Sequence, residues 1–343
     1  MIEKILNFLS NYSKIHGWLS MITCLIGVLL NIINIKILTS NKFKTHYCNS
    51  IFISIALFNS ITMITYLPYT IHYYIINQDL LLVDSHPKRD TLFWTSYAIL
   101  STIICLTTHS ISIWLTVYLS IYRYITIKKQ SLNSHSLKYN NLIILLIIIF
   151  CIIISIPSYL YPDILEQNST SNDSFVYLIR QSDLNIQTNN LIFKLSFYTQ
   201  AIPAKIIPCC LLSIFIPLII YNLIIINKKK QRLLQIKTRM IDEAVSKKHK
   251  KVSVNDRSEK NNHKTIMLVS VCLLLLIAEL PQAILLLCSI FSDYIYWSFY
   301  KPLGDLLDIL VFITYPIDFF IYCSMSELFR KEFCLLFKFK LFQ

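Results

Sequence analysis

Four carboxylates stand inside long apolar stretches of this sequence, where a charge is expensive. Glu279 lies within LLLLIAELPQAILLL, and Asp305, Asp308 and Asp318 share KPLGDLLDILVFITYPIDFF. In hydrocarbon a carboxylate normally faces a partner or a water-filled space. Asp305 and Asp308 are three residues apart and would share one helix face, with Asp318 roughly 15 Å further along at the helical rise. The spacing therefore predicts an upper pair of acids for binding and a separate, deeper acid.

Two cations stand in comparable surroundings. Arg123 ends the apolar run TTHSISIWLTVYLSIYRYITI, which Lys128 and Lys129 follow. An arginine there is commonly one that reaches the membrane interface, and the alternative is a residue that engages a partner on that side. For Lys205, one interpretation is an ion pair with Glu279 or an upper aspartate, and the other is a direct role in binding.

The composition makes the bilayer the natural solvent. Of 343 residues, 55% are hydrophobic and 15% charged, and the mean hydropathy is +0.55, too apolar for a soluble domain. The net charge is +13, but the lysines gather between apolar segments, so we expect no nucleic-acid partner. The cysteines lack metal-site spacing and no phosphate-loop, HExxH or GxSxG motif occurs. We therefore expect no metal, no cofactor and no enzymatic activity.

Seven apolar runs are each about the ~20 residues needed to cross a membrane. They predict an all-α membrane protein, a bundle of seven transmembrane helices within residues 17–323. The fourth run is nearly pure Leu, Ile and Phe, which indicates a lipid-facing helix. The predicted spans are 17–39, 50–76, 92–126, 140–161, 195–227, 265–291 and 302–323.

Charge placement orients this bundle. If residues 1–16 form an outside tail, roughly 24 of the 32 Lys and Arg fall on the inner side, as the positive-inside rule requires. Three glycosylation sequons, at Asn11, Asn168 and Asn172, then all lie outside. No cleavage site follows a separate hydrophobic region, so we expect no removable signal peptide. The prediction is a multi-pass protein of the plasma membrane, in contact with its lipids, with its N-terminus outside.

Two basic segments belong to the inner side. Residues 228–264 form a long lysine-rich third inner loop, whose first half either extends the fifth helix or lies solvated near anionic lipid. Residues 324–343 place apolar residues at helical spacing with basic residues between them, which predicts a short amphipathic helix on the inner leaflet. Cys334 in this tail is either a palmitoylation site or an inert thiol.

Several motifs, in order and at suitable spacing, resemble rhodopsin-like (family A) G-protein-coupled receptors. Asn31 closes a GxxxN pattern that begins at Gly27, Arg123 matches the arginine of the third-helix DRY-type motif, Pro281 matches the sixth-helix proline, and DFFIY from Asp318 stands where NPxxY usually stands. More closely, the chain resembles invertebrate FMRFamide- and myosuppressin-type neuropeptide receptors, a group related to nematode srw-class receptors. The stretches that carry this resemblance are HSISIWLTVYLSIYRYI, KIIPCCLLSIFIPLII, AELPQAILLL and KPLGDLLDILVFITYPIDFFIYCSMSELFRKEF.

The chain departs from the family pattern at its inner switch. Asn59 stands where the second helix usually carries aspartate, and Asp318 where the seventh usually carries asparagine. By resemblance, these two residues with Asn31 and Ser112 form a sodium-like polar cluster that retains one acid. Tyr122 replaces the acid before Arg123, so we expect a looser inactive state.

Two further departures concern the outer side. Ala98 replaces the usual disulfide cysteine and residues 161–194 contain no cysteine, so that disulfide is absent. Cys105 stands where amine receptors carry aspartate, which disfavours a monoamine ligand.

The resemblance implies a receptor for an amidated FMRFamide- or myosuppressin-like peptide that activates a heterotrimeric G protein. The guanidinium of such a peptide would bind Asp305 and Asp308 in an aromatic-lined cup. Arg123, Tyr124 and Tyr322 would meet the G protein. Alternatives are a chemosensory receptor for a small molecule, or a polytopic transporter, although no repeat between halves appears. The other expected ligand-binding residues are Tyr69, His72, His109, Lys205, Glu279 and Gln282.

Overall fold

The computed structural model shows a bundle of long helices. It describes residues 2–41, 49–80, 85–128, 137–168, 175–244, 253–325 and 327–338. Within them seven helices are long and apolar enough to cross a membrane, which confirms the predicted seven-helix fold. The main helices are α1 (Ile2–Leu38), α2 (Asn49–Thr70), α3 (Leu92–Lys128), α4 (Leu137–Leu160), α6 (Leu191–Ala201), α7 (Ile207–Ala244), α8 (Ser253–Phe291), α10 (Lys301–Met325) and the C-terminal α11 (Glu327–Lys338).

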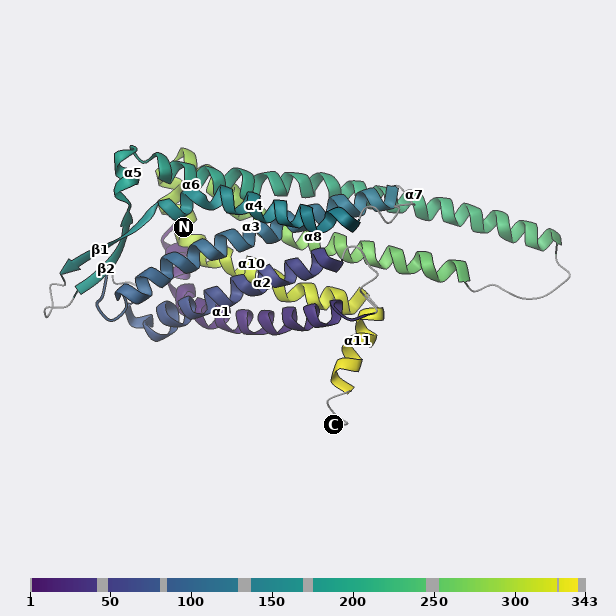
Figure 1. The fold of residues 1–343 in the computed structure, drawn as a ribbon, viewed down its shortest axis with the longest axis horizontal. Helices are drawn as coiled ribbons and strands as arrows, with labels where there is room; N and C mark the ends of the chain where they lie inside the picture. The colour runs from purple at the N-terminus through teal and green to yellow at the C-terminus, as the bar shows by residue number, and fades with distance from the viewer. Residues whose placement is uncertain are drawn as a thin grey trace.

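The bundle has two distinct ends (Figure 1). At the end where α11 lies, α7 and α8 run beyond the other helices. At the opposite end a hairpin of β1 (Pro162–Asn168) and β2 (Phe175–Gln181) pairs Pro162 with Gln181 in antiparallel register. Between the hairpin and α6 lies the short helix α5 (Asp183–Gln187). The hairpin was not expected: its strands are short and lie in what reads as a loop.

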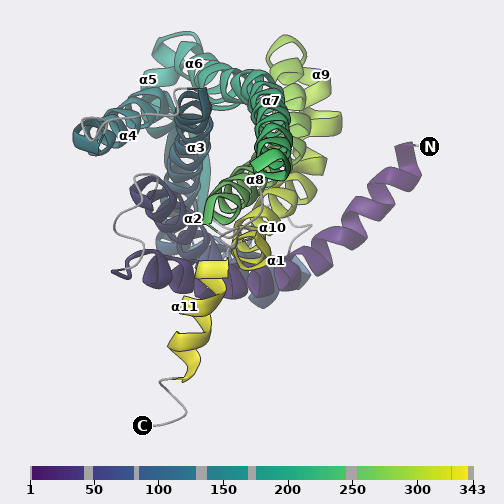
Figure 2. The same ribbon diagram turned by 90° about the vertical axis from the view of Figure 1, so that its right-hand side faces the viewer.

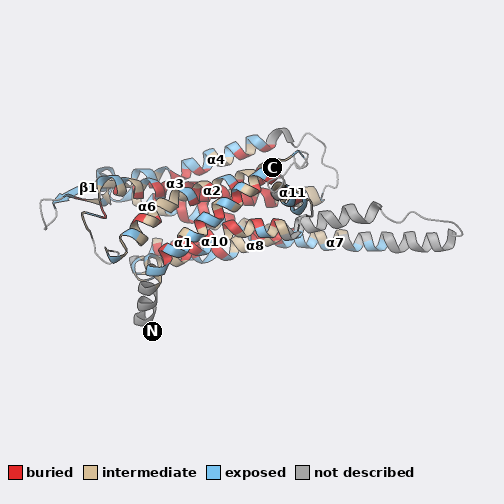
Figure 3. Ribbon diagram, turned by 90° about the horizontal axis from the view of Figure 1, so that it is seen from below, coloured by how far each residue is buried: buried red, intermediate tan, exposed pale blue. Residues whose placement is uncertain are grey.

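Helix α3 occupies the centre of the bundle and α4 its edge (Figure 2). Of the most apolar window of each span, 61% is buried in α3 but 28% in α4. Leu145, Leu146 and Ile153 of α4 are all more than half exposed, which agrees with the predicted lipid-facing helix. Buried residues accordingly concentrate on the inward sides of the helices (Figure 3).

Three helices change to wide π-helical turns on the half of the bundle nearer the hairpin. These are η1 (Ile71–Ile76) after α2, η4 (Ile202–Ile206) between α6 and α7, and η5 (Tyr296–Tyr300) before α10; the remaining short elements are the 3-10 turn η2 (Gln78–Leu80) and the helix α9 (Asp293–Ile295). Such turns are rare and often mark functional sites, because the extra residue redirects the side chains that follow.

The apolar core is largest at the end near α11. There Phe329 of α11, 1% exposed, packs against Phe319 and Tyr322 of α10. This contact anchors the C-terminal helix beside the bundle. A second, smaller apolar cluster includes Cys24, Met63 and Tyr315, and polar side chains occupy space beside it.

The N-terminal helix differs from expectation. Helix α1 begins at Ile2, not near residue 17, and its apolar span begins at Tyr12. No proline and no glycine precede Gly17, so nothing in the sequence interrupts the helix. The first half of the 228–264 loop likewise continues α7 to Ala244, which is the helical alternative of the two considered.

Candidate functional site

A cavity of about 270 Å³ lies between the helices on the hairpin side of the bundle. Its wall comes from α2, η1, α3, η4, α8 and α10, so elements distant in sequence build it together. The wall combines carboxylates, one lysine, tyrosines and small hydroxyl residues. The lining residues are Thr62, Tyr66, Tyr69, Tyr74, Ser101, Thr102, Cys105, Leu106, His109, Lys205, Gln282, Gly304, Asp305, Asp308, Val311, Phe312 and Tyr315.

Asp305 and Asp308 both line this cavity from α10. Asp305 accepts hydrogen bonds from Tyr74 Oη (2.7 Å) and Ser13 Oγ (3.1 Å). Asp308 Oδ1 accepts a long one, 3.4 Å, from Gln282 Nε2. All these donors are neutral groups, and no ion pair between described residues involves either aspartate. The two carboxylates therefore face the cavity without a cationic partner from the described part of the chain.

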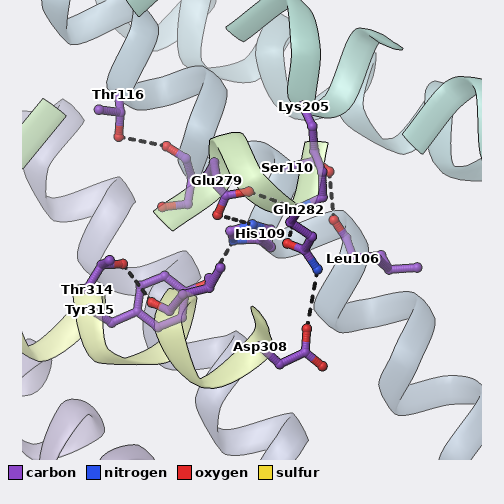
Figure 4. Close-up of polar contacts among 12 residues, drawn as sticks. Leu106, His109, Ser110, Thr116, Lys205, Glu279, Gln282, Asp308, Thr314 and Tyr315 are labelled. Atoms are coloured by element: carbon purple, nitrogen blue, oxygen red, sulfur yellow. Dashed lines mark hydrogen bonds and ion pairs between the residues drawn. The ribbon is translucent and has the colours of Figure 1, made fainter. Parts of the chain in front are cut away.

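The lysine of the cavity is already paired (Figure 4). Lys205 Nζ donates to Glu279 Oε2 at 2.8 Å and to Gln282 Oε1 at 2.7 Å. The side chains of this ion pair are 5% and 1% exposed, so neither charge is shared with solvent. Lys205 thus neutralises Glu279, and Gln282 separates its ammonium from Asp308.

On the cavity wall, His109 connects this pair to α10. Its Nε2 lies 2.9 Å from Glu279 Oε1, and its Nδ1 lies 2.7 Å from the hydroxyl of Tyr315. The imidazole thus lies between the Glu279 carboxylate and the Tyr315 hydroxyl. The result is a chain of polar side chains across α3, η4, α8 and α10, close in sequence to Pro281 of α8.

Aromatic rings surround the acids. The rings of Tyr66 and Tyr69 lie 5.6 Å apart, and those of Tyr66 and Phe312 lie 4.5 Å apart. Both aromatic faces and carboxylates attract cations. Acids and rings on one wall therefore suit a positively charged group with apolar surface.

The expected ligand-binding residues lie mostly at this cavity. Tyr69, His109, Lys205, Gln282, Asp305 and Asp308 line it. Glu279 lies just behind the wall, bonded to Lys205. His72 lies outside the cavity lining, because its ring stacks on Trp94 at 3.8 Å and its Nε2 lies 2.9 Å from the carbonyl oxygen of Arg89.

Sequence reasoning missed three contributors. Tyr74 reaches Asp305 from η1. The π-helical turn there points the side chain in a direction that a regular helix would not predict. Ser13 was placed in a tail, and Tyr315 was hidden among the apolar residues of α10. Only the four tyrosines and one histidine in YLPYTIHYY indicated the aromatic wall.

The deeper polar residues are only partly connected. Ser112 Oγ donates to Asn59 Oδ1 at 2.6 Å, which joins α3 to α2. Asn31 Nδ2 donates to the carbonyl of Gly27 in its own helix at 3.0 Å. Asp318 is half-buried on α10, and no hydrogen bond between described residues links it to the other three.

At the α11 end, Arg123 is half-buried in α3. Its Nε is enclosed and has no hydrogen-bond partner among the described residues. Tyr124 contacts Phe215 of α7, with ring centres 5.8 Å apart, and Tyr322 packs between Phe52 and Phe329. Tyr124 and Tyr322 belong to the apolar cluster that also contains Phe329 of α11.

The β-hairpin is tied to α3 without a cysteine. Thr95 Oγ1 donates to the carbonyl of Tyr177 at 2.9 Å, and the Tyr177 amide donates to the carbonyl of Asp90 at 3.0 Å. A buried ion pair between Arg89 and Asp90, at 2.9 Å, holds the segment that receives the hairpin. Asn168 ends β1 and is exposed, whereas Asn172 and the side chain of Asn11 lie outside the described residues.

Comparison with known proteins gives matches along most of the chain. Residues 18–340 match the profile described as the serpentine type 7TM GPCR chemoreceptor Srw. The G-protein coupled receptor dmsr-1 of Caenorhabditis elegans is 28% identical over 350 residues, which cover 94% of this chain and 68% of that protein. Sex peptide receptor-related protein 2 of the same organism is 28% identical over 245 residues, 67% of this chain and 51% of the relative.

Proposed function

Because this chain belongs to the serpentine seven-transmembrane Srw family of G-protein-coupled receptors, we propose that it is a receptor for an extracellular cationic peptide. The peptide is amidated and of the FMRFamide or myosuppressin type, and its binding activates a heterotrimeric G protein. One observation carries the proposal: Asp305 and Asp308 face an aromatic cavity with only neutral donors, while Lys205 is already paired with Glu279.

The charge balance of the cavity selects the ligand class. Lys205 and Glu279 cancel each other, so the two aspartates leave an excess of negative charge. A guanidinium offers five donors in a planar fork that suits carboxylates, and it stacks on aromatic faces such as those of Tyr66 and Tyr69. An arginine followed by an aromatic residue supplies both groups.

The size of the cavity limits how much of a peptide enters. At about 270 Å³ it lies just below the ~300–1,000 Å³ of common ligand pockets. Only the end of a peptide enters such a space, which suits recognition of an amidated terminus. The name of one relative, sex peptide receptor-related protein 2, is consistent with a peptide ligand.

The polar chain supplies a route from ligand to signal. A cation on Asp308 weakens its contact with Gln282, which also holds Lys205. Lys205 and His109 in turn hold Glu279, two residues before Pro281 in α8. Agonist would favour the arrangement in which α8 swings about this proline and the Arg123 end opens for the G protein.

The proposed setting is the plasma membrane with the cavity end outside. The lysines of the 228–264 segment then lie in the cell, as the positive-inside rule favours. In the same orientation Asn168, at the tip of β1, is available for glycosylation.

The decisive variant is Asp308→Asn, which keeps the shape of the side chain and removes its charge. We expect the potency of the peptide Phe-Met-Arg-Phe-amide to fall about tenfold or more, the scale of ~1.4 kcal/mol for a lost charge pair. Calcium and cAMP responses in transfected cells measure it, with surface expression read by an antibody to an N-terminal tag on intact cells.

The matched control is Asp163→Asn, which neutralises the half-exposed partner of Arg180 on the hairpin and should leave potency unchanged. An unaltered dose–response curve for Asp308→Asn at equal surface expression would refute the assignment. Failure of the tag antibody to bind intact cells would refute the orientation.

A chemosensory receptor for a small organic cation is the second candidate. The small volume of the cavity and the chemoreceptor description of the family profile favour it. A response to small guanidinium compounds that amidated peptides do not elicit would establish this alternative.

A further inference from the structure

Gly304 lies on the cavity face of α10, directly beside the acids. It is four residues before Asp308 in the regular helix α10, so the two positions share one side of the helix. It also precedes Asp305 and is itself part of the cavity wall. A side chain at this position would therefore point toward the space next to both carboxylates.

The three glycines of this chain have different surroundings. A Cβ atom on Gly17 would meet Cβ of Tyr74 at 2.6 Å, and one on Gly27 would meet Sδ of Met63 at 2.4 Å. Those two glycines allow helices to approach closely. A Cβ on Gly304 would have no described atom within 4 Å, so close packing does not explain the glycine there.

Backbone conformation does not explain it either. No glycine among the described residues has a positive φ, and Gly304 lies within the regular helix α10. Glycine in a helix interior is less favourable than alanine. The glycine therefore weakens α10 locally and leaves empty volume next to Asp308.

We propose that Gly304 is a specificity-determining residue that sets the size of the cationic group able to reach Asp305 and Asp308. The inference deepens the proposed function and rests on it. The space suits a wide, planar cation such as a guanidinium, which needs room to meet two carboxylates. A compact ammonium needs less room and depends less on the missing side chain.

Graded substitution tests this with Gly304→Ala and Gly304→Leu, both good helix formers. The probes are Phe-Met-Arg-Phe-amide and its analogue with lysine in place of arginine. We expect the arginine peptide to lose about threefold to tenfold potency with alanine and about a hundredfold with leucine. The lysine analogue should lose less, so the preference for arginine should narrow.

The control on the same helix is Leu310→Phe, which adds volume at a side chain 42% exposed outside the cavity lining and should change neither potency. Surface expression of the Gly304 variants should equal that of the parent receptor. If they respond like the parent while Asp308→Asn loses potency, the inference falls and the proposed function stands.

A second measurement needs no peptide. Gly304→Cys, made with Cys105→Ser because Cys105 also lines the cavity, is treated with membrane-impermeant methanethiosulfonates of positive or negative charge. The measured quantity is the labelling rate of the cationic reagent divided by that of the anionic reagent. We expect this ratio to be about tenfold or more higher at the introduced cysteine than for free 2-mercaptoethanol, and we expect Asp308→Asn to lower it.

If Phe-Met-Arg-Phe-amide activates no form of the receptor, the proposed peptide ligand is wrong. The cysteine-labelling experiment then decides the inference about Gly304. Cation-selective labelling would then still support Gly304 as the open position beside the acids. A cysteine that is not labelled, or that is labelled with the charge ratio of the free thiol, would overturn it.

Discussion

Lys205 and Glu279 form an ion pair in surroundings where an isolated charge is not tolerated. Their side chains are 5% and 1% exposed, and His109 and Gln282 occupy the remaining positions around them. Removal of one partner from such a pair is more damaging than removal of both, because the remaining charge stays buried. Each member of the pair therefore depends on the other for stability, and both are part of the proposed signalling route.

This asymmetry predicts the behaviour of two variants. Lys205→Met should lower the free energy of unfolding by roughly 3–5 kcal/mol, since Glu279 is left buried without its ammonium partner. Adding Glu279→Gln to the same chain should restore most of the loss. Thermal denaturation of the detergent-solubilised receptor measures both. A single variant as stable as the parent would show that solvent reaches Glu279.

At the residue scale, the sequence identified the acids but not their partners. A carboxylate within an apolar run is energetically costly, so it normally has a partner or a function. For this reason Asp305, Asp308 and Glu279 could be identified from the sequence. The pairing of Lys205 with Glu279 was one of two open interpretations, because 74 residues separate them and only the packing of η4 against α8 decides between the two. His72 was predicted to line the ligand site, and it does lie in the predicted second span. Its side chain points elsewhere, because it lies in a π-helical turn and stacks on the ring of Trp94.

At the scale of elements, the β-hairpin takes its position from backbone and hydroxyl contacts. Thr95 and Asp90 bind Tyr177 of β2, and the Arg89–Asp90 pair supports them. The strands themselves escaped prediction, because seven-residue segments between long apolar helices carry little periodicity.

Reducing conditions should consequently leave the hairpin end of the bundle intact. Dithiothreitol should change the potency of Phe-Met-Arg-Phe-amide by less than about twofold, since no cysteine occurs in residues 161–194. Dose–response curves before and after treatment measure this. Loss of the response on reduction would reveal a disulfide that supports the site.

Thr95→Val, in contrast, removes one hydrogen bond of about 1 kcal/mol between α3 and the hairpin. This variant should make the hairpin more susceptible to limited proteolysis.

At the scale of the whole molecule, the cavity and Arg123 lie toward opposite ends of one bundle. The number of spans and their approximate limits could be predicted from hydropathy, because a helix needs ~20 apolar residues to cross the hydrocarbon core of a membrane. The extension of α1 to Ile2 did not follow, because polar residues in a continuous helix resemble a tail. Arg123 was expected to lack a local acid, and its enclosed Nε has no partner among the described residues.

An arginine without a local acid should leave the receptor easier to activate. Tyr122→Asp should lower basal G-protein activation several-fold, because a neighbouring carboxylate holds the guanidinium in the inactive arrangement. Nucleotide exchange on the G protein in membranes without ligand measures this, and Tyr122→Asn controls for the lost ring. Equal basal activity in the aspartate and asparagine variants would contradict the prediction.

The π-helical turns η1, η4 and η5 have a consequence for counting positions along these helices. Each adds a residue to a helical turn, and Tyr74, Lys205 and Tyr300 lie within these turns. A count of positions along an ideal α-helix, continued through one of these turns, therefore assigns the residues beyond it to the wrong face of the helix.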